Sequence, residues 1–205
     1  MNTENLDNYL TVSSLPQSVE LKIKGSKFIG HVFYVLNKNQ AEAIYANIRR
    51  KYHDATHNCY AYRISSDEFR YSDDGEPSGT GGKPIYQVLQ NKELVQTIII
   101  VTRYFGGTKL GIGGLSRAYA EAAIETLKNT KIEIKTIYKT LTIETAYETL
   151  SHLLDLITKF HGIIGKTEYS DRITYCVQIP LSRSNLFASE LLAFTDRGIK
   201  IIEGH

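Results

Sequence analysis

The chain has 205 residues, more than most single domains contain, so one large domain or two small ones are allowed. With 42% hydrophobic residues, 22% charged residues and four prolines, it holds enough apolar material for a core, which excludes a disordered chain. The net charge of +2 gives little overall attraction for nucleic acid. Residues 1–135 nevertheless carry +3 and residues 136–205 carry −1, so an anion-binding face is expected in the first part.

Cysteine usage and hydropathy indicate a compartment. The two cysteines, Cys59 and Cys176, lie far apart and form no C-x-x-C pair, which excludes a disulfide scaffold and suits a reducing cytosol. The longest apolar run is too short to cross a bilayer. The first ten residues, MNTENLDNYL, lack the basic start and apolar core of a signal peptide. We therefore expect a cytoplasmic protein with no membrane contact.

The first part of the chain alternates strand and helix patterns. Apolar and polar residues alternate over 19–36 around a Gly-Ser pair, which predicts a β-hairpin. Apolar residues at helical spacing over 41–52 predict an amphipathic helix. Two further β-prone runs, 57–64 and 68–73, are separated by a polar turn and predict a second hairpin.

Glycine dominates the next part. The segment DDGEPSGTGGKP, residues 73–84, is rich in Gly and Pro and predicts a loop. A short helix over 85–90, a β-branched strand over 94–102 and an alanine-rich helix over 115–127 are expected after it. Nine of the 15 glycines fall between residues 75 and 114, so the backbone should shape this region more than side chains do.

A regular pattern follows residue 135. It predicts, in order, a strand over 137–145, a helix over 150–157, strands over 163–169 and 173–179, a helix over 185–194 and a strand over 199–202. This βαββαβ order is the ferredoxin-like arrangement, and its length is usual for a small domain. We predict a boundary within 131–136, with domains 1–133 and 134–205.

The strongest local feature is the segment RYFGGTKLGIGGLSRAYAEA, which connects the end of a predicted buried strand to a predicted helix. Backbone amides at a helix start attract anions, and Arg103, Lys109 and Arg117 add positive charge, so a phosphate or nucleic-acid backbone would fit. The glycine spacing matches neither a P-loop nor the dinucleotide fingerprint. The alternative is a structural motif: a tight strand-to-helix turn whose glycines serve packing, with Asp73, Asp74 and Glu76 folded back onto this face and paired with the arginines. We predict that Gly106 and Gly107 lie in a turn, with at least one glycine at positive φ.

A second constellation is HDATHNCYAYR followed by DDGEPSG. On a strand, His57 and Cys59 share a face, so one hypothesis is a cysteine nucleophile beside a histidine. A second hypothesis is a metal site whose ligands come from His53, His57, Asp73, Asp74 and Glu76. The spacing is specific for neither, and polar groups in a turn more often cap it and hydrogen-bond to it.

The chain contains 14 tyrosines and no tryptophan. Tyr60, Tyr62, Phe69 and Tyr71 fall on the second predicted hairpin, where aromatic rings on an open sheet could stack on nucleic-acid bases. The alternative, which we favour, is that these tyrosines are half-buried strand residues beneath helices.

Three segments, ATHNCYAYRI, SDDGEPSGTGGKPI and VTRYFGGTKLGIGGLSRAYAEA, resemble the YigZ/IMPACT family, and bacterial YigZ-type members resemble this chain along nearly its whole length. The resemblance implies an α+β fold of two domains. The first would be similar to ribosomal proteins and domain IV of elongation factor G, and the second to the ferredoxin-like domain V. Eukaryotic relatives keep the first domain and regulate translation by binding a ribosome-associated activator of a stress kinase.

The resemblance also marks residues for test. The expected anion- and nucleic-acid-binding set combines family positions with the other two cations of the charge argument: Arg103, Tyr104, Gly106, Gly107, Lys109, Gly111, Gly113, Gly114 and Arg117. The second family motif comprises His57, Asp73, Asp74, Gly75 and Glu76. One departure stands at Gly81, where alanine is expected in many relatives, and glycine there is expected only to loosen the loop.

These observations favour a noncatalytic translation-associated regulator that binds the ribosome, RNA or a ribosome-bound protein through the glycine-rich face of the first domain. No cofactor, metal or catalytic residue is expected, and no oligomeric state is predicted. Two alternatives stay open. One is a hydrolase, with or without a metal, using His53, His57, Cys59 and the Asp73–Glu76 cluster. The other is a protein-interaction module that binds no RNA.

Overall fold

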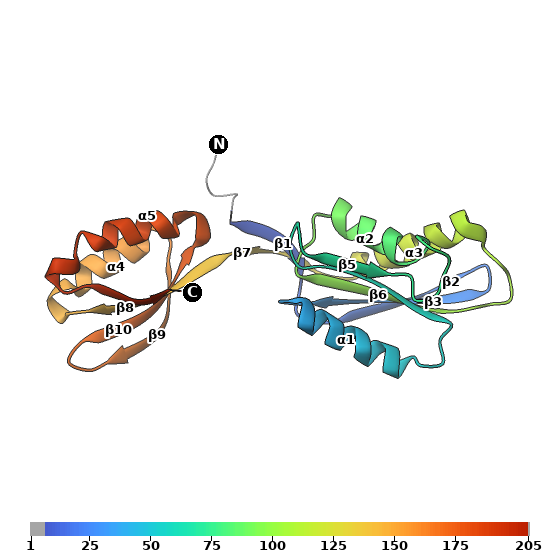
Figure 1. The fold of residues 1–205 in the computed structure, drawn as a ribbon, viewed down its shortest axis with the longest axis horizontal. Coiled ribbons are helices and arrows are strands. Elements are labelled where there is room, and N and C mark those ends of the chain that lie inside the picture. The colour runs from blue at the N-terminus through green and yellow to red at the C-terminus, as the bar shows by residue number, and fades with distance from the viewer. Residues whose placement is uncertain (1–6, 205) are drawn as a thin grey trace. The chain divides into compact units, whose positions relative to one another are not determined.

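The computed structural model describes residues 7–204 and separates the chain into two compact units (Figure 1). The first unit is formed by residues 9–135, and the second by residues 7–8 together with residues from 136 onward. This break falls within the predicted range 131–136, two residues after the domain end placed at residue 133, and residues 7–8 group with the second unit instead of the first. Residues 1–6 and 205 of the predicted domains lie outside the described residues. The predicted mixture of helices and strands is confirmed.

The first unit is built on a five-stranded antiparallel sheet with the order β2-β3-β6-β4-β5. Its strands are β2 (Gln17–Ile23), β3 (Ser26–Tyr34), β4 (His57–Arg63), β5 (Phe69–Ser72) and β6 (Thr97–Tyr104). The two predicted hairpins are β2-β3 and β4-β5. In the central strand β6, Arg103 lies opposite Phe28 of β3 and His57 of β4. This register brings parts of both predicted motifs together at one end of the sheet.

Three helices cover this sheet: α1 (Lys38–Lys51), α2 (Gly82–Asn91) and α3 (Gly111–Lys128). Helix α1 lies on one face, while α2 and α3 lie on the other (Figure 1). Because successive strand residues point to opposite faces, Cys59 and Ala61 of β4 pack under α2 and α3, and Tyr60 and Tyr62 pack against α1. Tyr60 and Tyr62 are therefore buried, which agrees with the favoured interpretation of the tyrosines.

A two-stranded sheet of β1 (Asn8–Val12) and β7 (Ile132–Thr136) was not expected from the sequence. The sequence pattern predicted a domain boundary within residues 131–136 and no strand there. They form a strand because their partner lies near the other end of the chain, and a local pattern does not reveal such a partner. Ser13 N donates to the Lys131 carbonyl at 2.9 Å at one end of this ribbon.

The second unit has the predicted βαββαβ order. Its elements are β8 (Tyr138–Thr145), α4 (Leu150–Lys159), β9 (Ile163–Tyr169), β10 (Ile173–Pro180), α5 (Leu181–Leu192) and β11 (Lys200–Gly204), with short 3₁₀ turns at Tyr147–Thr149 and Thr195–Arg197. The strand order is β11-β8-β10-β9, and every neighbouring pair is antiparallel. Both helices cover one face (Figure 1) and close a core that includes Ile143, Leu153, Val177 and Phe187.

No helix within residues 7–204 combines the length and the apolar character that a membrane crossing requires.

Candidate functional site

The glycine-rich segment connects β6, which ends at Tyr104, to α3, which begins at Gly111. Gly107 has a φ of +85° and Gly111 a φ of +72°, so the predicted turn with positive φ is confirmed. Gly106 has another role, because a Cβ there would overlap the backbone of Gly25 in the β2-β3 turn. Its N–H donates to Ser26 Oγ at 3.2 Å. The segment is thereby held against the first hairpin.

Much of this segment presents bare backbone. A Cβ added at Gly107, Gly111 or Gly113 would meet no atom within 4 Å. Gly113 also lies outside the left-handed region, so neither conformation nor packing within this chain requires a glycine there. Helix α3 starts without a side-chain cap, so the amides of its first turn are open to other acceptors. Lys109 and Arg117 are exposed, and neither forms an ion pair with the described residues.

Arg103, the first residue of the predicted anion-binding set, is buried and already paired. Its Nη1 donates to Glu76 Oε1 at 2.7 Å and its Nη2 to Ser26 Oγ at 3.3 Å. The guanidinium carbon lies 5.5 Å from the ring centres of both Phe28 and Phe105. A guanidinium with only 7% of its side-chain surface exposed requires such a counter-charge. Its Nε has no partner in the described part of the chain.

Glu76 is the centre of this buried network. Tyr119 of α3 donates its hydroxyl to Glu76 Oε1 at 2.8 Å, and burial raises the pKa of that phenol, which keeps it protonated and able to donate. The other carboxylate oxygen, Oε2, lies 3.8 Å from His57 Nε2. Sequence analysis did not single out Tyr119. Its position four residues after Leu115, on the apolar face of an alanine-rich helix, was the available indication, since a buried tyrosine hydroxyl usually finds a partner.

The two aspartates of the second motif build their own loop. Asp73 Oδ1 accepts from the N–H groups of Gly81 and Gly82, and its Oδ2 from Gly79 N, each at 2.8 Å. Asp74 has a φ of +43°, and its Oδ2 accepts from the Asn58 N–H at 2.7 Å. Gly75 follows with a φ of +88°, which completes the turn. Of the three acidic residues, Glu76 is the one that turns toward the glycine-rich segment.

His57 and Cys59 also hold this loop. They share a face of β4 as predicted; His57 Nδ1 contacts the Asp74 carbonyl at 2.8 Å, and Cys59 Sγ donates to the Asp73 carbonyl at 3.0 Å. Burial raises the pKa of the Cys59 thiol, which disfavours the thiolate that nucleophilic attack needs. His53 is exposed and lines a separate pocket with Arg49 and Thr56 among others. Within residues 7–204, no group of three or more His, Cys, Asp or Glu residues is placed to hold a metal ion.

A cavity of about 340 Å³ lies where the two predicted motifs meet. It is lined by Glu76, Pro77, Arg103, Phe105, Lys109, Leu110, Gly111, Ile112 and Leu115. Arg103, Lys109 and Gly111 come from the predicted anion-binding set, and Glu76 from the second motif. Tyr104 lies nearby in sequence but donates its hydroxyl to Asp54 Oδ1 at 2.8 Å instead. The cavity thus combines a buried charged pair, an apolar wall and a helix start.

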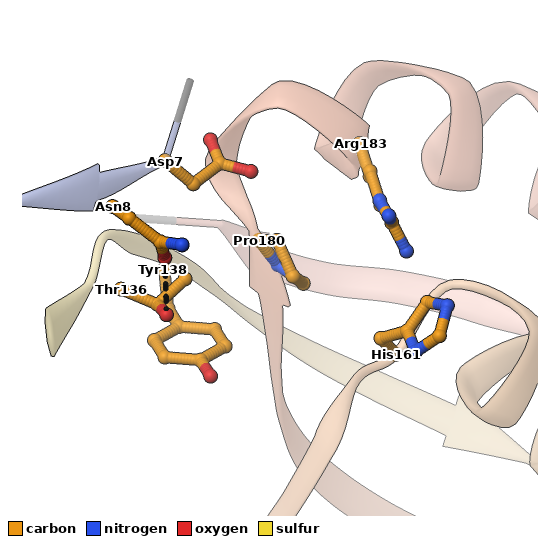
Figure 2. A pocket seen from close by; sticks show the side chains of 7 residues that line it. All are labelled: Asp7, Asn8, Thr136, Tyr138, His161, Pro180 and Arg183. Atoms are coloured by element: carbon orange, nitrogen blue, oxygen red, sulfur yellow. Dashed lines mark hydrogen bonds between the residues drawn. The ribbon is translucent and has the colours of Figure 1, made fainter. Parts of the chain in front are cut away.

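A smaller cavity of about 170 Å³ belongs to the second unit, where sequence analysis predicted no site. Figure 2 shows its seven lining side chains, which include Asp7, Thr136 and Arg183. Asp7 has a structural role, because its Oδ1 accepts a hydrogen bond from the Ser182 N–H at 2.6 Å at the start of α5. Thr136 Oγ1 donates to Asn8 Oδ1 at 2.9 Å.

The fold and site define a two-unit α+β protein in which a glycine-rich strand-to-helix segment covers a buried Arg–Glu–Tyr network. Residues 24–127 match the Impact N-terminal domain. The chain is 31% identical to the IMPACT family member YvyE of Bacillus subtilis over 201 residues, which cover 97% of this chain and 92% of that protein. It is 28% identical to the IMPACT family member YigZ of Escherichia coli, over 93% of this chain and 96% of that one.

A solved structure supports the same relationship. A crystal structure described as that of a hypothetical protein is 28% identical, with a TM-score of 0.68 over 96% of this chain and 97% of that chain. The chain belongs to the IMPACT family, as its three motifs predicted.

Proposed function

We propose that this chain is a noncatalytic translation-associated regulator that binds the ribosome, RNA or a ribosome-bound protein through the glycine-rich face, defined here as residues 105–117. The observation that carries the proposal is the bare backbone at the start of α3. Gly113 is a glycine that the chain's own fold does not need, and the space above it is open. A partner that approaches the backbone closely would need it. Family membership adds the link to translation, because the resemblance implies that eukaryotic relatives regulate translation with this domain.

The electrostatics of this face favour an anionic partner. The amino end of the 18-residue helix α3 carries partial positive charge, and its first amides have no side-chain cap. Lys109, which precedes the helix, and Arg117, in its second turn, are exposed and can form charge-assisted hydrogen bonds with phosphate. Arg103 contributes differently from the expectation, because Glu76 balances its charge. Lys109 and Arg117 therefore supply the positive charge of this face that is available to a partner.

Most of the side chains considered for a hydrolase, namely His57, Cys59, Asp73 and Asp74, hold the loop after β5 instead. Cys59 is fully buried and donates to a backbone carbonyl, and Asp73 accepts three backbone N–H groups. A residue committed to such contacts is poorly placed to attack a substrate or to bind a metal. These contacts support a binding role in preference to hydrolysis.

We also propose that the two units are independent domains, the first corresponding to domain IV of elongation factor G and the second to its ferredoxin-like domain V. The topology of the second unit supports its part of this assignment. Helix α4 connects β8 to β9 with β10 between them, and α5 connects β10 to β11 with β8 between them. Two interleaved split β-α-β units of this kind make up the ferredoxin-like arrangement.

Ribosome co-sedimentation across a salt series tests the proposed function. Lys109→Ala and Arg117→Ala are each expected to weaken association and to reduce the slope of log affinity against log salt by about one unit. Lys92→Ala, which removes an exposed lysine at the end of α2, is the matched control and is expected to behave as wild type. No association of the wild-type protein at low or moderate salt would contradict the proposal. Recovery of one stoichiometric protein partner without RNA would favour the protein-interaction alternative.

A further inference from the structure

The cavity at the glycine-rich face has a polar floor with unused hydrogen-bonding capacity. Both short hydrogen bonds to Glu76, from Arg103 and Tyr119, end on Oε1. Oε2 lies 3.8 Å from His57 Nε2, which is beyond hydrogen-bond length. Arg103 Nε is buried without a partner in the described residues. A buried charged pair with spare acceptor and donor positions is ready to contact one further polar group.

The wall of the cavity is apolar and includes an aromatic ring. Phe105 is 47% exposed and Ile112 is 73% exposed, although both are large hydrophobic residues. Pro77, Leu110 and Leu115 complete the wall. The volume of about 340 Å³ is at the lower end of the range for small-ligand sites. A flat group about the size of one nucleobase, stacked on the Phe105 ring, would cover this exposed surface.

The rim of the cavity is positive. Lys109 and Gly111 line it, and Gly111 is the first residue of α3, whose opening amides are uncapped. Floor, wall and rim together provide a carboxylate acceptor, a stacking surface and a phosphate position in one site. These are the three features that recognise a nucleotide with N–H donors on its base edge.

We propose that the cavity holds one unstacked guanine of a single-stranded RNA, with the base edge on Glu76 and the neighbouring phosphate at Lys109 and the start of α3. Guanine is selected because its N1–H and N2–H are adjacent donors that can both point at one acceptor, the unused Oε2 of Glu76. Adenine and cytosine place an acceptor beside their amino group, and uracil places its one N–H between two carbonyls. The inference rests on the proposed function, because it names the RNA feature that the glycine-rich face binds.

The direct test is fluorescence anisotropy of the full chain with three labelled RNA hexamers, UUGUUU, UUIUUU and UUAUUU, where I is inosine. Guanosine is expected to bind about tenfold more tightly than adenosine, since a contact with two base donors discriminates by roughly that factor. Inosine keeps N1–H and lacks the N2 amino group, so its affinity should fall between the other two. Equal affinity for the three strands would overturn the guanine site.

Variants locate the site. Glu76→Gln is expected to abolish the preference for guanine, but Glu76 also balances Arg103, so a variant that leaves the buried network intact is needed as well. Ile112→Glu puts a negative charge at the exposed rim and is expected to weaken binding of UUGUUU at least tenfold. Leu36→Glu changes an equally hydrophobic residue, 57% exposed and located before α1, and serves as the control with no expected change.

The outcomes separate this inference from the proposed function. If all three strands bind equally and Lys109→Ala weakens each of them, the glycine-rich face binds RNA but has no guanine site. If no strand binds while ribosome co-sedimentation still depends on Lys109, the guanine site is overturned and the proposed function stands. If co-sedimentation is absent as well, both fail. A guanine preference that survives Ile112→Glu unchanged would place the recognition elsewhere and overturn the inference.

Discussion

Arg103 is the residue around which the first unit's site is built. It is the last fully buried residue of β6, and an uncompensated charge there would be strongly destabilising. Glu76 supplies the compensating carboxylate, Tyr119 fixes the orientation of that carboxylate, and Ser26 links the guanidinium to the β2-β3 turn. Arg103 therefore joins the loop after β5, the start of β3 and α3. Arg103 lines the cavity with its charge balanced, whereas exposed Lys109 and Arg117 form no ion pair with the described residues.

A second buried titratable residue, His31 of β3, makes the stability of the first unit depend on pH. His31 is 4% exposed, its Nε2 has no partner in the described residues, and burial, with a smaller effect from Lys51, lowers its pKa from 6.5 to about 4. Below about pH 6.5 the unfolded chain therefore binds a proton at His31, whereas the folded chain binds that proton only near pH 4. Stability from this residue is complete above pH 6.5 and falls by about 3 kcal/mol as the pH drops to 4.

The measurement is urea unfolding of the wild-type protein and of His31→Leu between pH 7 and pH 4. The variant should lose about 3 kcal/mol less stability over that range than wild type, because leucine does not titrate. The exposed His53, changed to Leu in the same way, is the control and should leave the wild-type dependence in place. Parallel pH profiles for wild type and His31→Leu would show that His31 is protonated in the folded state.

At the scale of elements, local patterns predicted what neighbouring residues decide. Both hairpins of the first unit and all six elements of the second were expected, because each has its own apolar period. Helices α2 and α3 were expected to start at residues 85 and 115, yet begin at Gly82 and Gly111. Glycine has no apolar side chain, so apolar periodicity does not reveal a helix that begins at glycine. For α2, the Asp73 carboxylate, nine residues earlier in the chain, caps Gly82.

The parts that sequence patterns missed depend on contacts between distant residues. The β1-β7 pair joins the two ends of the first unit, and the Glu76–Arg103–Tyr119 network joins a loop, a strand and a helix. The sequence left open whether an acidic residue of the second motif pairs with the arginines, and the structure shows that Glu76 pairs with Arg103. Gly81 is a further case: it was expected to loosen the loop, but a Cβ there would overlap the Cys59 sulfur. The structure instead requires glycine for close packing of the loop on β4.

The loop before α2 should depend strongly on one carboxylate. Asp73→Ala removes the acceptor of three backbone N–H groups, those of Gly79, Gly81 and Gly82. Loss of a helix cap together with unsatisfied N–H groups is expected to lower the free energy of unfolding by roughly 2–4 kcal/mol. Asp73→Asn keeps one acceptor oxygen and should fall between Ala and wild type. Urea unfolding measures the change.

The control for this loop is Asp67→Ala. Asp67 is an exposed aspartate in the β4-β5 turn, so its removal should change stability by less than about 0.5 kcal/mol. If Asp73→Ala and Asp67→Ala were equally stable, the three contacts to Asp73 would not hold the loop, and the argument that Asp73 is structural would fail.

At the scale of the whole molecule, the positive charge excess and the glycine-rich face lie in the same part of the chain. The positive excess lies in residues 1–135, which contain the glycine-rich face, whereas the later residues carry a slight negative charge. The apolar cores are also distinct: clusters on the two faces of the five-stranded sheet belong to the first unit, and a third cluster belongs to the second. Binding and the second core are therefore expected to respond to different substitutions.

Two large-to-small substitutions test this division. Leu89 in α2 and Phe187 in α5 are both fully buried, one in each unit. Leu89→Ala should destabilise the first unit by about 2–5 kcal/mol and Phe187→Ala the second by about 3–5 kcal/mol, because each leaves a cavity in a packed core.

Native-state hydrogen exchange read by mass spectrometry should show lost amide protection confined to residues 9–135 in the first variant and to 136–204 in the second. Phe187→Ala should retain the Lys109-dependent ribosome association, since the glycine-rich face lies in the first unit. Loss of protection across both units in either variant would mean that the chain unfolds as one cooperative body, and the proposal of two independent domains would be wrong.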